Sequence, residues 1–124
     1  MRTLLLACLA TLACAESVLT PDDVYGHWEV DAKAVTKEQK AAVESAAAVD
    51  GFGVTFTLKF ARITTSSADD GMFAGQWRLD DATATTATAV VLAKTGEERQ
   101  YHLTKKGKLL IVDELPGKLA LSKK

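Results

Sequence analysis

The sequence predicts a mainly β protein, a small antiparallel meander barrel of seven or eight strands with one helix after the first strand. Apolar and polar residues alternate with a period of two along most of the chain, as they do in half-buried strands. The alternating runs are short and end at Asp, Gly or Pro-Gly turn signals. A barrel is favoured over an open sheet because closure removes the exposed edges of a one-layer meander.

The first fifteen residues have the features of an export signal. Arg2 precedes an apolar run over residues 4–13, and Ala13, Cys14 and Ala15 are the small residues typical of a signal-peptidase site. The run is too short for a permanent membrane span, which needs about 20 apolar residues. We expect residues 1–15 to be a signal peptide, residues 16–24 a polar tether and residues 25–124 the folded domain. The protein would then be periplasmic or secreted.

A second processing site overlaps the first. Residues 11–14, Thr-Leu-Ala-Cys, resemble a bacterial lipoprotein box, in which Cys14 would become the lipidated first residue of the mature chain. The sequence departs from that pattern at Thr11, where lipoproteins have Leu or another larger aliphatic residue. Cleavage after Ala15 predicts a freely diffusing protein, and lipidation of Cys14 predicts an outer-membrane lipoprotein. The sequence leaves both open.

Alternation places the strands in order along the chain. The first strand is expected over residues 25–31, with Trp28 facing inward. Residues 53–60 alternate strictly in β-favouring residues, and residues 62–65 are a second strand or the continuation of this one. Later strands are expected over residues 73–79, in the run that ends at 90–92, and over 99–104, 109–112 and 119–121. Their faces predict one core that contains Phe56, Phe60, Trp77 and Leu121.

The helix is expected between the first two strands. Thr36 and Gln39 have the spacing of a capping box, and residues 37–49 are rich in Ala and contain no Gly or Pro. We expect this helix to pack across an open end of the barrel. Because its Ala face buries little area, we also expect it to be the least stable element.

Gly26, His27 and Trp28 open the first strand as the Gly-x-Trp signature does in lipocalins and fatty-acid-binding proteins. With a helix followed by an uninterrupted meander, the chain resembles small bacterial lipocalin-like (calycin-type) exported proteins. The resemblance implies that Trp28 closes one end of the barrel, with Lys123 or Lys124 packed over its ring. It also implies a binding module for a small apolar or amphipathic molecule.

The aromatic residues on the inward faces are the candidates for contacting such a ligand, although aromatic residues at these positions ordinarily form the core. They are Trp28, Phe56, Phe60, Phe73, Trp77 and Tyr101. If they fill the interior instead, the alternative is an envelope protein-interaction factor, such as an inhibitor or assembly protein, that has no ligand.

Residues that could carry catalysis or bind a metal are few. His27 and His102 lie on polar faces, and neither has a second His or Cys at ligand spacing. The sequence has no Gly-x-Ser-x-Gly elbow, no His-Glu-x-x-His motif and no phosphate-binding Gly loop. Two carboxylate pairs, Asp69-Asp70 and Asp80-Asp81, flank predicted turns, where Asp is favoured. We expect no enzymatic activity, no metal and no cofactor.

The charge balance argues against nucleic acid as a partner. The chain has 15 basic and 16 acidic residues, a formal net charge of −1, so it has no net attraction to polyanions. We expect a monomer whose partner is a small hydrophobic ligand or an envelope protein, with membrane association through the lipid anchor alone. A basic cluster near the C-terminus is either a solvated face or a contact for anionic envelope polymers or an acidic partner: Lys105, Lys106, Lys108, Lys118, Lys123 and Lys124.

Overall fold

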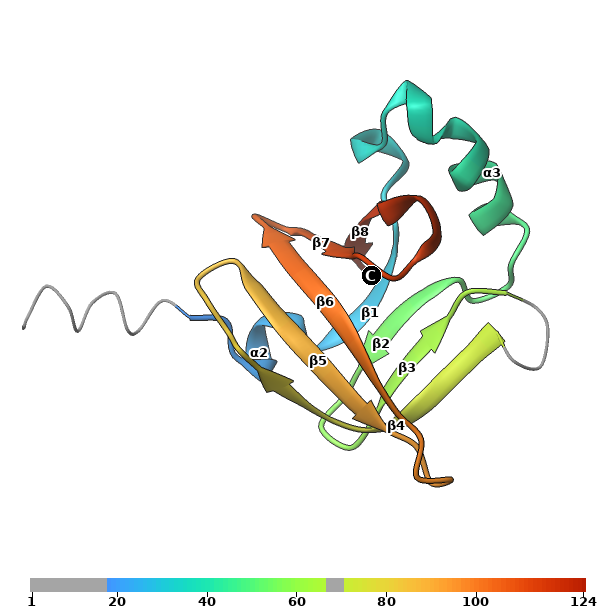
Figure 1. Cartoon of the computed structure of the whole chain (residues 1–124). Coiled ribbons are helices and arrows are strands. Elements are labelled where there is room, and N and C mark those ends of the chain that lie inside the picture. Colours follow the sequence, from blue (N-terminus) through green and yellow to red (C-terminus); the bar gives the residue numbers. More distant parts are fainter. Residues whose placement is uncertain (1–17, 67–70) are drawn as a thin grey trace, which may run out of the picture.

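The computed structural model describes residues 18–66 and 71–124, and in them eight antiparallel strands close into a barrel in sequence order (Figure 1). The predicted fold class is therefore confirmed, including the helix after the first strand. The predicted signal peptide, Cys14 and the pair Asp69-Asp70 lie outside the described residues. The strands are β1 (Gly26–Val30), β2 (Gly53–Phe56), β3 (Ala61–Thr64), β4 (Met72–Asp80), β5 (Thr86–Leu92), β6 (Glu98–Lys106), β7 (Leu109–Val112) and β8 (Ala120–Lys123). The α-helices are α2 (Pro21–Val24) and α3 (Lys40–Ala47).

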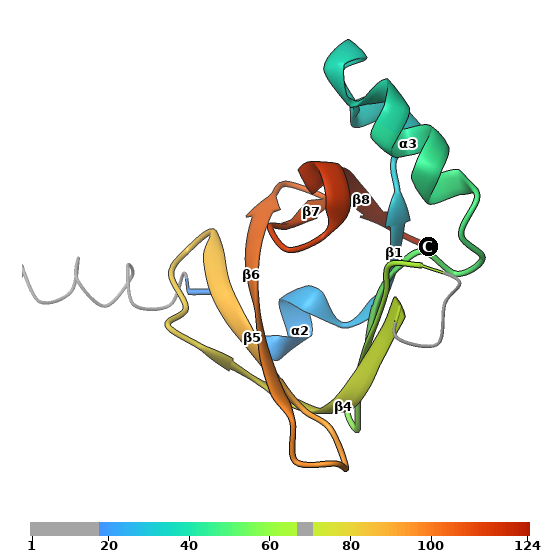
Figure 2. The ribbon, with the colours of Figure 1, turned by 45° about the vertical axis from the view of Figure 1, so that its right-hand side comes forward.

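Each strand pairs with its neighbours in the sequence, and β1 pairs with β8, where Val30 lies opposite Leu121, to close the ring (Figure 2). We call the end at which β1, β3, β5 and β7 begin the first end of the barrel, and the opposite end the second end. Antiparallel order then places α2 and the C-terminus at the first end. The long β1–β2 connection, which contains α3, and the β7–β8 connection lie at the second end.

The barrel interior is filled by side chains from alternate positions of the strands. The largest fully buried residues include Trp28, Phe56, Leu103, Leu110 and Leu121, and they belong to one hydrophobic cluster. Removing such apolar surface from water is the main source of stability in a chain of this kind. The centre of the barrel is therefore a packed core.

Closure depends on a bend in β4. Residues 72–75 of this strand pair with β3, whereas residues 76–80 pair with β5. At the change of partner stands Gly75, where an added Cβ would lie 2.1 Å from the carbonyl oxygen of Leu92. Glycine allows this close approach of two backbones, which lets β4 turn the corner of the barrel.

Residues 19–24 pack on the first end, which corrects the prediction of a tether over residues 16–24. The Leu19 N–H donates to the Thr83 carbonyl at 2.7 Å, so the segment reaches the β4–β5 connection. Val24 is fully buried, and its carbonyl accepts a hydrogen bond from the Trp28 indole N–H at 2.9 Å. These contacts close the first end on that side.

The polar residues that suggested a tether form the start of α2. The Thr20 backbone N–H donates to the Asp23 carboxylate at 2.8 Å, and Pro21 occupies the first turn of the helix. A cap and an N-terminal proline are start signals for a helix, even one of a single turn.

The predicted capping box is confirmed, and it begins a 3₁₀ turn (Lys37–Gln39) that leads into α3. The Thr36 N–H donates to Gln39 Oε1 at 3.0 Å, while Gln39 Nε2 donates to the Gly117 carbonyl at 2.9 Å. In Figures 1 and 2, α3 lies outside the ring of strands, and Ala46 is its buried residue. The helix flanks the second end instead of packing across it, contrary to the prediction.

Strand β2 ends at Phe56, four residues earlier than predicted, because Thr57 starts a turn. The Thr57 hydroxyl accepts hydrogen bonds from the backbone N–H groups of Lys59 and Phe60, at 3.3 and 3.1 Å. Such local side-chain bonds compete with the ladder of a sheet. As a result Phe60 is 38% exposed, and its prediction as a core residue is wrong.

Candidate functional site

The six aromatic residues proposed for ligand contact do not form one site. Trp28 and Phe56 are buried in the core, and Phe60 lies on the exposed β2–β3 turn. The half-buried Trp77 packs on Phe56, with ring centroids 4.7 Å apart, and its indole N–H donates to the Thr57 carbonyl at 2.7 Å. Phe73 and Tyr101 remain, and both face a pocket at the second end.

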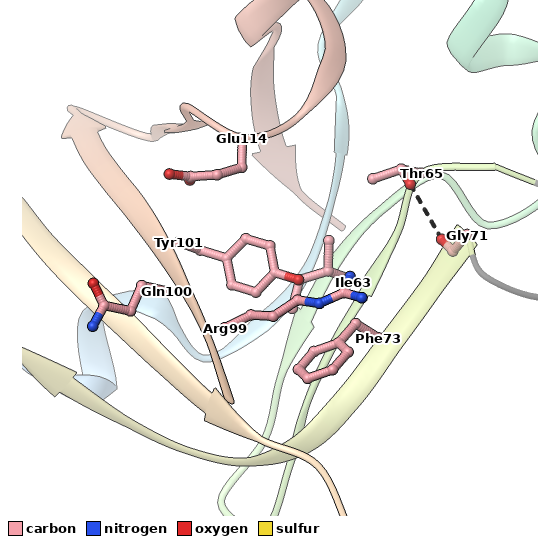
Figure 3. Close-up of a pocket in the computed structure, with 8 residues that line it drawn as sticks. All are labelled: Ile63, Thr65, Gly71, Phe73, Arg99, Gln100, Tyr101 and Glu114. Carbon is pink, nitrogen blue, oxygen red and sulfur yellow. Dashed lines mark hydrogen bonds between the residues drawn. The ribbon is translucent and has the colours of Figure 1, made fainter. Parts of the chain in front are cut away.

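This mouth pocket has a volume of about 360 Å³ and lies between the β3–β4 connection, the start of β6 and the β7–β8 connection (Figure 3). The volume is near the lower limit for small-molecule sites. No residue of α3 lines it, so the helix leaves it uncovered. The pocket is lined by Ile63, Thr65, Gly71, Phe73, Arg99, Gln100, Tyr101 and Glu114.

Arg99 is the cation of the mouth pocket. Its guanidinium carbon lies 4.3 Å from the centroid of the Phe73 ring, and its Nε donates to Glu97 at 2.8 Å. The hydrogen bonds to Glu97 and Tyr101 raise the pKa of Arg99. Burial raises the pKa of Tyr101, so its hydroxyl keeps its proton at neutral pH. One wall therefore offers a cation, a hydroxyl and an aromatic face.

Glu114, in the β7–β8 connection, supplies an acidic group to the mouth pocket. Its Oε1 accepts from the backbone N–H of His102 at 2.7 Å, and its Oε2 lies 2.5 Å from Nδ1 of the same residue. The hydrogen bond to Glu114 raises the pKa of His102. Because the carboxylate is held by these two bonds, it ties the β7–β8 connection to β6.

Sequence reasoning missed Arg99, Glu114, Ile63 and Thr65 as residues of this site. A signal for Arg99 was present, because it is in phase with the inward-facing Tyr101 at a spacing of two. An arginine on the inner face at the start of a strand indicates a barrel mouth. Glu114 gave no such signal, since it stands in a connection between strands.

The first end carries a second pocket, of about 390 Å³, around Trp28. The Lys123 ammonium lies 5.3 Å from the centroid of the Trp28 ring, which is the contact that the lipocalin-like resemblance implied for Lys123 or Lys124. The lining residues are Trp28, Asp31, Lys105, Lys108, Leu109, Ser122 and Lys123. Part of the predicted basic cluster therefore gathers here.

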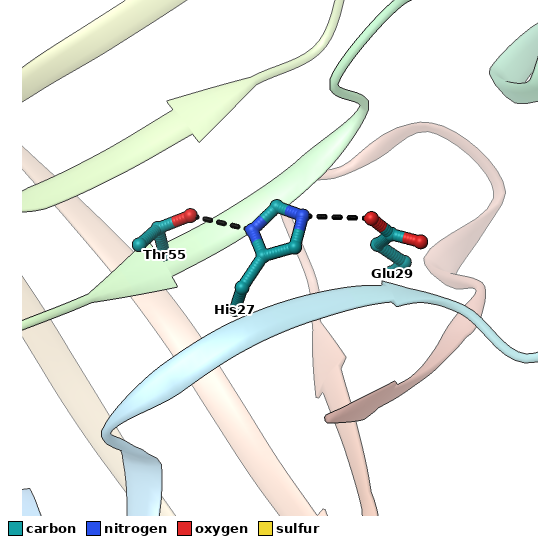
Figure 4. Close-up of polar contacts among 3 residues, drawn as sticks. All are labelled: His27, Glu29 and Thr55. Carbon is teal, nitrogen blue, oxygen red and sulfur yellow. Dashed lines mark hydrogen bonds and ion pairs between the residues drawn. The ribbon is translucent and has the colours of Figure 1, made fainter. Parts of the chain in front are cut away.

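His27 links two strands on the barrel wall (Figure 4). Its Nδ1 lies 2.6 Å from the Thr55 hydroxyl, and its Nε2 lies 2.8 Å from the Glu29 carboxylate. The order hydroxyl, imidazole, carboxylate is also that of a nucleophilic triad. However, the adjacent groove between β1 and α3 is lined by Glu29 and by neither of the other two residues. We interpret the cluster as a tie that holds β1 and β2 in register.

Within residues 18–66 and 71–124, no group of three or more His, Cys, Asp or Glu side chains is arranged to hold a metal ion. In that same part of the chain, no helix has the length and apolar character needed to cross a membrane. Comparison of the chain with protein-family models, with curated proteins and with solved structures finds no match.

Proposed function

We propose that this protein is an exported lipocalin-like binding module that holds a small amphipathic molecule at the mouth pocket. The observation that carries the proposal is the pocket in which the Arg99 guanidinium lies over the Phe73 ring. The filled core disfavours an apolar molecule enclosed in the barrel, so a ligand would bind at the surface of one of its ends.

The chemistry of the pocket favours a ligand with an anionic group and an apolar part. The cation of Arg99 would pair with a carboxylate, sulfonate or phosphate, and the Tyr101 hydroxyl would add a hydrogen bond. Ile63 and Phe73 would contact the apolar part. Glu114 would repel a second negative charge on the ligand, which favours monoanions.

Binding of 1-anilinonaphthalene-8-sulfonate, an anionic dye whose emission rises in apolar surroundings, tests the proposal. We expect saturable binding that fatty acids displace, and a loss of affinity of about tenfold or more in Arg99→Gln and in Phe73→Ala. Arg62→Gln removes the same charge from an exposed position on β3 and should bind normally. Equal affinity of Arg99→Gln and Arg62→Gln would contradict the site.

The second candidate function is an envelope protein-interaction factor, and the filled core favours it. Leu103, Leu110 and Leu121 occupy the space that a larger ligand would need. A protein that binds neither the dye nor fatty acids, with a natively folded barrel, would support this candidate over the first.

A further inference from the structure

An apolar tip projects from the first end of the barrel, on the β2–β3 turn. Leu58 is 82% exposed and Phe60 is 38% exposed. The turn that carries them is fixed, because the Thr57 hydroxyl accepts from Phe60 N–H and the Thr57 carbonyl accepts from Trp77. The exposure of both side chains is therefore part of the folded structure of this turn.

Exposed lysines lie at the same end of the barrel, both on the tip and across the rim from it, because the β6–β7 turn is four strands away from the β2–β3 turn in the closed ring. Lys59 belongs to the tip itself, Lys106 and Lys108 stand at the β6–β7 turn, and Lys124 follows β8. The Lys124 N–H donates to the His27 carbonyl at 2.9 Å, and His27 is paired with Thr55 of β2. Since neighbouring strands are about 4.8 Å apart, the C-terminal lysine lies about two strand widths from the strand that leads into the tip.

The first end also carries acidic groups, and Asp31 lines the pocket around Trp28 together with Lys105 and Lys123. Asp22 belongs to α2, and Asp80 and Asp81 stand at the β4–β5 connection. In the strand order, the rim from the β2–β3 turn through β1 and β8 to the β6–β7 turn carries the lysines, and α2 with Asp22 leads into β1 in the same half. This part of the rim therefore combines positive charge with exposed apolar side chains.

The described chain also enters at this end. It begins at Val18, which is 40% exposed and stands four positions after Cys14, the candidate lipidation site. Four residues span at most about 14 Å. An acyl group on Cys14 would therefore hold the first end, and not the mouth pocket, next to a bilayer.

We propose that the first end of the barrel docks on an anionic lipid bilayer. Leu58 and Phe60 enter the interface, while Lys59, Lys106, Lys108 and Lys124 contact lipid phosphates. Apolar side chains combined with lysines are what interfacial binding to anionic lipids requires. The mouth pocket, at the opposite end, faces away from the membrane and stays open to its ligand.

Co-sedimentation with vesicles tests this docking, using protein that begins at Glu16 and therefore lacks Cys14 but keeps every described residue. We expect binding to vesicles of phosphatidylcholine mixed with phosphatidylglycerol, weakened by salt, and much weaker binding to phosphatidylcholine alone. Leu58→Ser with Phe60→Ser should lower the affinity about tenfold or more. Lys106→Gln, Lys108→Gln and Lys124→Gln together should have an effect of similar size.

Matched controls come from the second end. Met72 and Leu92 are also exposed apolar residues, 54% and 43%, so Met72→Ser with Leu92→Ser removes comparable surface. Lys37→Gln, Lys40→Gln and Lys94→Gln remove the same number of charges. We expect both control proteins to bind like the parent. Absence of binding to the anionic vesicles, as expected if the tip serves a protein partner, or equal losses in the controls, overturns the proposal.

Discussion

Two phenylalanines at the end of β2 differ in what surrounds their side chains. Phe56 is 1% exposed and packs against Trp77, whereas Phe60 stands on the following turn and is 38% exposed. Burial of the first removes its whole ring from water. The Phe60 side chain leaves part of its ring in solvent and contributes little to the core.

Replacing each phenylalanine by alanine should therefore give unequal losses of stability. We expect Phe56→Ala to lower the free energy of unfolding by about 3–5 kcal/mol, because a cavity is left in the core. Phe60→Ala should cost about 0.5–1 kcal/mol, as for other exposed positions. Urea unfolding followed by tryptophan fluorescence measures both. Similar costs for the two variants would mean that Phe60 is buried after all.

Trp28 connects three parts of the first end. Its indole N–H donates to the Val24 carbonyl of α2, its ring is buried in the core, and the Lys123 ammonium lies over its face. A cation over an indole ring is a favourable electrostatic contact. The residue thus joins the N-terminal helix, the core and the last strand.

At the scale of elements, the two helices differ in what they cover. The helix α2 is a single turn, and its Val24 is fully buried within the core cluster. The longer α3 buries Ala46, and Ala42 packs so near Gly117 that an added Cβ there would lie 2.5 Å from the Ala42 Cβ. The short helix therefore closes the first end, and the longer one braces the β7–β8 connection.

The tie between β6 and the β7–β8 connection should make stability depend on pH. Glu114 raises the pKa of His102 above its ordinary value of 6.5. A raised pKa means that the charged pair stabilises the fold fully below about pH 6.5, and that this stabilisation is lost as the pH rises through the folded-state pKa. Because the pair is exposed, we expect a small effect.

Urea midpoints of the parent and of Glu114→Gln, measured at about pH 6 and about pH 8.5, check this dependence. Glutamine can still accept from the His102 N–H, so the variant isolates the charge. We expect the difference between the two proteins to be larger at the lower pH. His102→Gln should have the same profile as Glu114→Gln. A difference that does not change with pH would show that the pair contributes no linked protonation.

At the scale of the whole molecule, the barrel has two unlike ends. The first end has α2, the pocket around Trp28 and the exposed apolar tip, while the second end has the mouth pocket with Arg99. The chain enters at the first end. A protein tethered through its N-terminus would therefore present the mouth pocket away from its anchor.

Intact-mass analysis of protein from its native host should determine how the N-terminus is processed. We expect either the mass of residues 16–124 or a mass that includes Cys14 with attached acyl chains. The first result would exclude the lipoprotein and leave vesicle docking to the side chains of the first end. The second would add a firm anchor, because several acyl chains hold a protein far more firmly than one. A mass that retains residues 1–13 would contradict export.

Local pattern was enough to predict the barrel itself. Period-two alternation and turn residues led to seven or eight strands, of which the barrel has eight, and the spacing of Thr36 and Gln39 correctly indicated a cap. These features are readable because the backbone geometry of a strand or a helix start repeats within a few residues. The resemblance through Gly26 and Trp28 also led to Lys123 or Lys124 as the cation over the Trp28 ring, and the structure has Lys123 there.

Tertiary structure alone decided where β2 ends, what α2 covers and which residues meet at the mouth. Thr57 ends β2 through side-chain bonds that alternation cannot reveal, and Val24 becomes buried only because the ring of strands offers it an end to fill. Arg99, Phe73 and Glu114 come from separate elements and are adjacent because the barrel is closed. Sequence patterns report the faces of single elements, whereas a site built from several elements depends on how closure brings their ends together.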